Sequence, residues 1–179
     1  MDLPHLIQLI QASGPAEWMR TSVKAMPVVE SLHVLAAATV FGSIFIVDLR
    51  LLGLLDMRRR YTLISREMLR LTWVAFGVAV VAGTLMFSAN AHTYYVNTAF
   101  RLKMLAVLAA GVNMAVFQRI TLKTVGSWDE RAPVPWSARL AGGLSIVLWT
   151  SVIFLARWIG FTKGYDFSIP DNTHINFQF

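Results

Sequence analysis

The sequence predicts an all-α integral membrane protein: a bundle of four transmembrane helices with a short interfacial helix at the N-terminus. Of the 179 residues, 56% are hydrophobic and only 15% are charged, with a mean hydropathy of +0.56. A soluble domain of this length has too small a core to hide so much apolar surface, so the surplus has to face either lipid or another protein, and lipid is the simpler assumption. In addition, four apolar segments approach or exceed the roughly 17–25 residues that a helix needs to cross a bilayer.

Composition also excludes several kinds of site and partner. The chain has no cysteine, which rules out disulfides, thiolate metal sites and iron–sulfur clusters. Its net charge is +6, but the Lys and Arg residues stand between apolar runs and do not gather in one patch. We therefore expect a lipid bilayer as the environment and no nucleic-acid partner.

The N-terminal 27 residues predict a segment that lies on the membrane surface. Residues 3–12 place apolar side chains at helical spacing, as an interfacial helix does. The pair Gly14-Pro15 ends this pattern, and a second short helix is expected over residues 15–25. Because no basic region precedes a continuous apolar stretch, we expect no cleavable signal peptide and a first span that acts as its own insertion signal.

The spans follow in one membrane domain, residues 1–179. They are expected at about 28–55, 71–91, 100–117 and 140–161. None contains an interior proline, and Pro27 stands at the start of the first, where its missing N–H costs nothing. The domain thus divides into an outer N-terminal segment (1–27), the four spans (28–161) and an outer C-terminal tail (162–179).

The basic residues predict the orientation. Ten of the 16 Lys and Arg residues lie in or beside the two segments that join span one to two and span three to four, and the other six lie on the opposite side. Cytoplasmic segments carry the excess of basic residues. We therefore expect a multi-pass protein of the bacterial inner membrane with both termini in the periplasm.

Polar residues inside the spans are the best functional pointers, because each is costly in lipid. Glu30 and His33 are three residues apart and share a face near the outer end of span one. They form either a local hydrogen bond or a ligand or proton site, since histidine binds metals and haem iron. At the inner end, Asp48 and Arg50 are two residues apart and point to different faces, so each is expected to pair with a neighbouring helix or to reach the interface. Asn113 is expected to form an interhelical hydrogen bond.

A group of polar residues maps to the outer half of the bundle. It comprises Glu30, His33, His92, Tyr94, Tyr95, Arg101, Lys103 and Arg157. A haem b would use His33 and His92 as axial metal ligands and place its propionates against the cations. A quinone would need a His or Tyr for its carbonyl, and an anionic lipid headgroup would need only the cations. Because His92 sits at or beyond the end of its helix, bis-histidine ligation is possible but not required.

Two stretches resemble a family of uncharacterised four-helix bacterial inner-membrane proteins. Residues 30–54, ESLHVLAAATVFGSIFIVDLRLLGL, have a similar Glu-x-x-His start and Asp-Leu-Arg-Leu-Leu-Gly end, and residues 83–117 contain a similar Phe-Arg-x-Lys followed by an Asn. The residues that match the pattern are Glu30, His33, Asp48, Arg50, Arg101, Lys103 and Asn113, while His92 is not part of it. The resemblance implies the architecture rather than an activity. The Leu-His followed by small residues is also faintly similar to the copper-resistance D membrane proteins.

Two classes of function follow from these residues. The first is a membrane subunit of a redox system, which binds haem b or quinone near the periplasmic face and relays electrons from a periplasmic partner. The alternative is a non-redox anchor or scaffold subunit of a larger inner-membrane complex. Permeation of a metal or small solute ranks lowest, because the middle of the spans offers few polar groups. No hydrolase or transferase motif is present, so we do not expect the chain to be an enzyme on its own.

Overall fold

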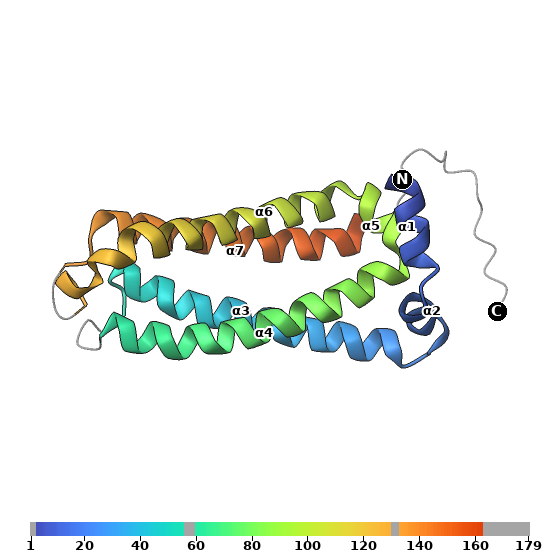
Figure 1. Cartoon of the computed structure of the whole chain (residues 1–179), viewed down its shortest axis with the longest axis horizontal. Coiled ribbons are helices and arrows are strands. Elements are labelled where there is room, and N and C mark those ends of the chain that lie inside the picture. The colour runs from blue at the N-terminus through green and yellow to red at the C-terminus, as the bar shows by residue number, and fades with distance from the viewer. Residues whose placement is uncertain (1–2, 56–59, 130–132, 163–179) are drawn as a thin grey trace.

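The computed structural model describes residues 3–55, 60–129 and 133–162, and these residues form an all-α fold (Figure 1). In chain order the elements are α1 (Leu3–Gln11), α2 (Gly14–Thr21), α3 (Ala25–Leu52), α4 (Tyr61–Ala89), α5 (Ala91–Val96), α6 (Thr98–Val116), the π-helical η1 (Phe117–Thr121), the 3-10 helix η2 (Leu122–Ser127) and α7 (Trp136–Thr162). Helices α3, α4 and α7, and α6 extended to Ile120, are long and apolar enough to cross a membrane. The prediction of an all-α, four-helix, multi-pass bundle is confirmed.

The four long helices form two layers. Helix α3 packs along α4 and α6 packs along α7, while contact between α3 and α7 joins the layers (Figure 1). Helices α4 and α6 follow one another in the chain through α5, yet in the described residues they share at most a marginal contact. The bundle is therefore less tightly closed between α4 and α6 than between α3 and α7.

The spans bury only a small share of their apolar residues inside the protein, unlike the helices of a soluble bundle. In the apolar stretch of 18 residues that defines each span, at most 22% of the residues are buried. Most of each helix surface is therefore left to face lipid. The buried positions of α3 include Ala36 and Ser43, whereas Val34 and Leu35 are exposed. Small residues let helix backbones approach closely in a membrane. The Ser43 and Thr72 hydroxyls, 2.7 Å apart, add a hydrogen bond between α3 and α4.

One end of the bundle carries α1, α2 and α5 (Figure 1). Helix α1 matches the helix predicted over residues 3–12, and α2 begins one residue before the predicted second helix and ends at Thr21. Met19 of α2 is buried against Val29 and Ala82. The Arg20 guanidinium donates to the Ala89 carbonyl at the end of α4 and to the Gln11 carbonyl at the end of α1. These contacts attach the N-terminal helices to the bundle.

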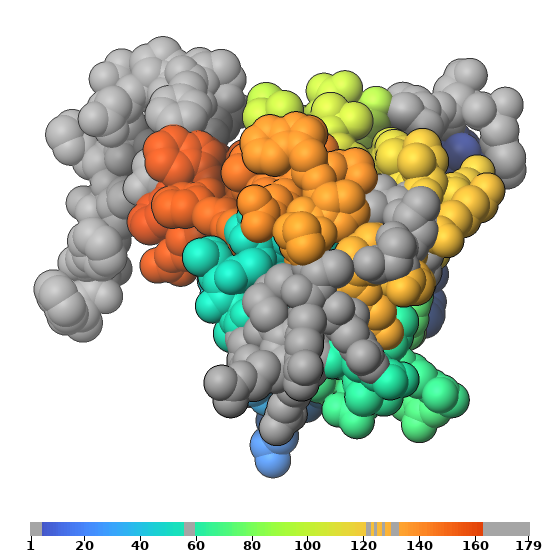
Figure 2. Space-filling model, turned by 90° about the vertical axis from the view of Figure 1, so that its left-hand side faces the viewer, coloured from blue at the N-terminus to red at the C-terminus, as the bar shows by residue number. Residues whose placement is uncertain are grey.

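We call the opposite end the connection end, because α3 ends there and η1 and η2, which extend α6, lie there (Figures 1 and 2). Helix α3 stops in a Schellman motif: Gly53 has φ +79°, its N–H donates to the Arg50 carbonyl, and the Leu54 N–H donates to the Leu49 carbonyl. Tyr61 then packs its ring against Phe117 and Trp128. The segment 124–138, predicted to be irregular, contains part of η2 and the first residues of α7.

Candidate functional site

His33 lies inside the membrane-spanning part of α3. This helix of 28 residues is about 42 Å long, against a hydrocarbon core of about 30 Å. His33 is eight residues from its start, which places the ring roughly 6 Å inside the core if the helix protrudes equally at both ends. A polar ring at this depth needs a partner, and the structure supplies one.

The partner is the carbonyl oxygen of Ala79 on α4, 2.8 Å from His33 Nδ1. A carbonyl only accepts hydrogen bonds, so Nδ1 carries a proton and donates it. In the neutral ring this leaves Nε2 with a free lone pair. The helix interface therefore fixes both the orientation of the ring and the nitrogen that is left to bind something else.

Gly83 of α4 provides the space for the ring. A Cβ atom at this position would lie 3.0 Å from His33 Cε1 and 3.3 Å from His33 Nδ1. The first distance is at the limit that real Cβ contacts tolerate, so any larger residue has to displace the imidazole. Ala79 and Gly83, one helical turn apart, together form the seat of His33.

Lys103 brings a cation to His33 from the other layer. It lies on α6, is half-buried, and is within electrostatic range of the imidazole, as is Glu30. Among the described residues no hydrogen bond joins Glu30 to His33, so the ring bonds to α4 and not to its own helix. Glu30 is exposed one turn before His33. The predicted outer group thus has a smaller centre, consisting of His33, Lys103 and Glu30.

The structure places the residues of α5 apart from this centre. His92 is exposed. Tyr94 is buried, and its ring lies 6.2 Å from that of Phe87 and 5.4 Å from that of Phe100. The ring contacts of Tyr94 are thus with Phe87 and Phe100, and no hydrogen bond in the described part of the chain joins His92 to His33. A separate short helix α5 was not expected, and it is the reason why His92 does not continue the face of α4.

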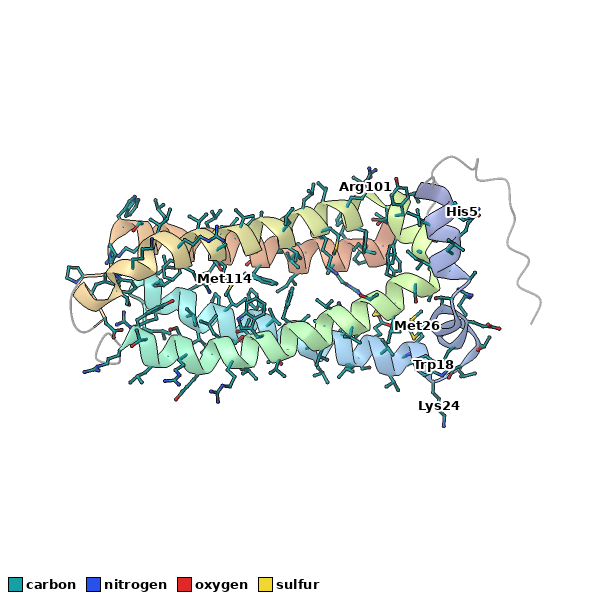
Figure 3. The ribbon with its side chains drawn as sticks, viewed as in Figure 1. His5, Trp18, Lys24, Met26, Arg101 and Met114 are labelled. Atoms are coloured by element: carbon teal, nitrogen blue, oxygen red, sulfur yellow. The ribbon has the colours of Figure 1, made fainter. Side chains whose placement is uncertain are left out.

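The two other predicted cations also point elsewhere. Arg101 is exposed, points away from the bundle (Figure 3), and lies over the Tyr95 ring at 5.8 Å. Arg157, near the end of α7, is exposed and lies over the Phe161 ring at 4.9 Å. Both arrangements suit cations at a membrane interface, where the aliphatic stem stays in apolar surroundings. Neither Arg101 nor Arg157 is among the groups within electrostatic range of His33.

The remaining predicted polar residues hold helices together. The Asn113 amide donates to the Ala141 carbonyl on α7 at 3.0 Å, which confirms the expected interhelical hydrogen bond. Asp48 lies within hydrogen-bonding reach of Ser145 of α7, and Arg50 donates to the Asp129 carbonyl, so each has a partner in another segment, as expected. In the described ranges no group of three or more His, Asp or Glu side chains could hold a metal ion.

Comparison with known proteins adds one match. The model of a family of unknown function, DUF6644, matches residues 21–162. The chain belongs to the DUF6644 family. The DUF6644 match includes all four spans and every candidate residue from Glu30 to Arg157, and it begins after α1, at the last residue of α2. No curated protein and no solved structure matches the chain. The predicted membership of an uncharacterised family is thus confirmed, while the likeness to the copper-resistance D proteins stays a prediction.

Proposed function

We propose that the chain is a membrane subunit of a redox system that binds a quinone at His33 and Lys103. The observation that carries this proposal is the hydrogen bond from His33 Nδ1 to Ala79, which leaves Nε2 as an acceptor with the Lys103 cation within electrostatic range of the ring. A site at this depth is most accessible to a molecule that dissolves in lipid.

The two side chains complement the two states of a quinone. The hydroxyl of a quinol donates a hydrogen bond, and His33 Nε2 accepts one. The carbonyl of the oxidised quinone accepts a hydrogen bond, and the Lys103 ammonium donates one. The surrounding apolar spans suit the ring and its hydrocarbon tail. Binding both states is what a subunit that relays electrons from a periplasmic partner requires.

Haem b at the same histidine is a second candidate, because a metal-ligating histidine commonly donates its other N–H to a backbone carbonyl. His33 meets this condition. The second axial ligand predicted from the sequence is His92, which is exposed on α5. The described residues therefore fit the quinone better than a haem held by two histidines.

The location that we propose is the bacterial inner membrane, with His33 towards the periplasm. The bias of Lys and Arg towards the connection end supports this orientation. Helix α3 begins and α7 ends at the α1–α2 end, the end to which His33 is closer (Figure 1). A partner that delivers electrons would then approach α1, α2 and α5.

The test is to measure the quinone and haem that copurify with His33→Asn and His92→Asn in mild detergent. The amide of the first variant can still donate to the Ala79 carbonyl but has no counterpart of Nε2. We expect His33→Asn to lose quinone roughly tenfold, the effect of about 1.4 kcal/mol, and His92→Asn to keep it. Extraction and chromatography measure the quinone, and oxidised and reduced absorption spectra detect haem.

Two other results would replace the quinone proposal. A haem absorption band that disappears in both variants would assign bis-histidine haem. Wild-type protein without quinone or haem would favour the alternative, a non-redox anchor of a larger complex, since Asn113, Asn97 and Ser43 already serve to join helices.

A further inference from the structure

A second buried polar site lies near the connection end, centred on Asp48 of α3. Its side chain is only 5% exposed, although it lies in a helix built to cross the membrane. The Ser145 side chain of α7 lies within hydrogen-bonding reach of the carboxyl group. Asp48 Oδ2 has no hydrogen-bond partner among the described residues. This carboxyl group is therefore only partly satisfied.

Close packing of α7 on α3 produces this burial. A Cβ atom at Gly142 would lie 3.1 Å from Leu51 Cβ and 3.2 Å from the Asp48 carbonyl oxygen. The α7 backbone thus rests directly on the turn of α3 that carries Asp48. Ser145, three residues further along α7, is buried in the same interface.

A carboxyl group in such a place has two possible states. As a carboxylate it needs donors for both oxygens, because an unpaired charge or polar group in apolar surroundings is costly. With a proton on Oδ2 it is neutral, so no charge is buried in apolar surroundings. Asp48 Oδ2, which has no hydrogen-bond partner among the described residues, is therefore the oxygen that would carry the proton.

Neighbouring polar groups extend from Asp48 towards the connection end. Asp48, Arg50 and Asp129 all lie within electrostatic range of the Tyr61 hydroxyl, which hydrogen-bonds Ser65. Arg50 is fully buried and donates to the Asp129 carbonyl, whereas Asp129 is itself partly exposed. Tyr61 therefore has both the buried Asp48 carboxyl and the partly exposed Asp129 within electrostatic range.

We propose that Asp48 is a proton-binding site that exchanges its proton with the connection end past Tyr61 and Asp129. Asp48 and His33 lie on the same helix, 15 residues or about 22 Å apart, at opposite ends of the bundle. The proton site does not depend on the proposed redox function, because the carboxyl group would exchange its proton whether or not a quinone is bound.

The test is infrared difference spectroscopy of the full chain in lipid vesicles, recorded between two pH values. We expect a carboxylic-acid C=O band that changes with pH, shifts in D2O, and disappears in Asp48→Asn. The control is Glu67→Gln, which removes an exposed acid of α4 and should leave the band in place. A band that persists in Asp48→Asn, or wild-type protein without such a band, would overturn the proposal.

A second variant keeps the test decisive if Asp48→Asn does not fold. Ser145→Ala removes the hydroxyl within hydrogen-bonding reach of Asp48, so the same band should move to higher frequency and still respond to pH. An unchanged band position in Ser145→Ala would contradict the assignment to Asp48. A band that responds to sodium in place of choline at constant pH would make Asp48 a cation site and would also overturn the proposal.

Discussion

The two nitrogens of His33 have different surroundings. Nδ1 donates to Ala79, and Nε2 is left to accept. The position of the ring depends on Gly83, which the sequence shows only as one glycine among several in the apolar spans. His33 and Lys103 could be predicted because polar residues are rare in a span. Ala79 could not, because its contribution is a backbone carbonyl, which every residue has.

Gly83→Ala tests the seat of His33. The new Cβ would meet the imidazole at 3.0 Å, displace it and weaken its bond to Ala79. The matched control is Gly77→Ala on the same helix, where a Cβ meets nothing within 4 Å. We expect Gly77→Ala to be neutral or stabilising, and Gly83→Ala to be less stable than this control by about 1–3 kcal/mol and to lose bound quinone. Thermal unfolding in detergent and quinone content measure the two effects; equal behaviour of the two variants would contradict the role given to Gly83.

At the scale of elements, the first ten residues of α4 show what hydropathy alone misses. The second span was predicted to start at about residue 71, whereas the helix starts at Tyr61. This first part is amphipathic: Tyr61 and Ser65 are buried, while Arg66 and Arg70 are exposed. A search for continuous apolar residues cannot detect such an extension. It is held by Asp129, whose carboxylate accepts from both the N–H and the hydroxyl of Thr62.

Asp129→Ala tests this cap, which a distant segment provides. An acidic side chain at the N-terminus of a helix satisfies a free N–H and favours the helix dipole. We expect its loss to destabilise the first turn of α4 by about 1 kcal/mol, so that hydrogen exchange in residues 61–65 becomes roughly five- to tenfold faster. The control is Glu67→Ala, an exposed acid on the same helix. The same exchange rate in both variants would show that Asp129 does not cap α4.

At the scale of the whole molecule, the sequence predicts the number of spans but not how they pair. All four are apolar around most of their surface, so hydropathy does not reveal that α3 packs on α4 and α6 packs on α7, nor which face of α6 turns towards the other layer. For this reason Arg101 and Lys103, two residues apart, were both assigned to the site, whereas only Lys103 lies within electrostatic range of His33. The N-terminal helices were correctly predicted as helices, but their attachment depends on Arg20, whose partners are backbone carbonyls.

Arg20→Ala tests whether this attachment closes the α1–α2 end of the bundle. One guanidinium donates to both the Ala89 and the Gln11 carbonyls, and a lysine, which carries a single nitrogen, should not replace it. We expect Arg20→Ala and Arg20→Lys to release α2, so that chymotrypsin cleaves after the exposed Trp18 several-fold faster. The control is Lys24→Ala, because Lys24 is exposed and points away from the bundle (Figure 3). If Arg20→Ala and Lys24→Ala are cleaved equally fast, Met19 and the other apolar contacts of α2 hold it without Arg20.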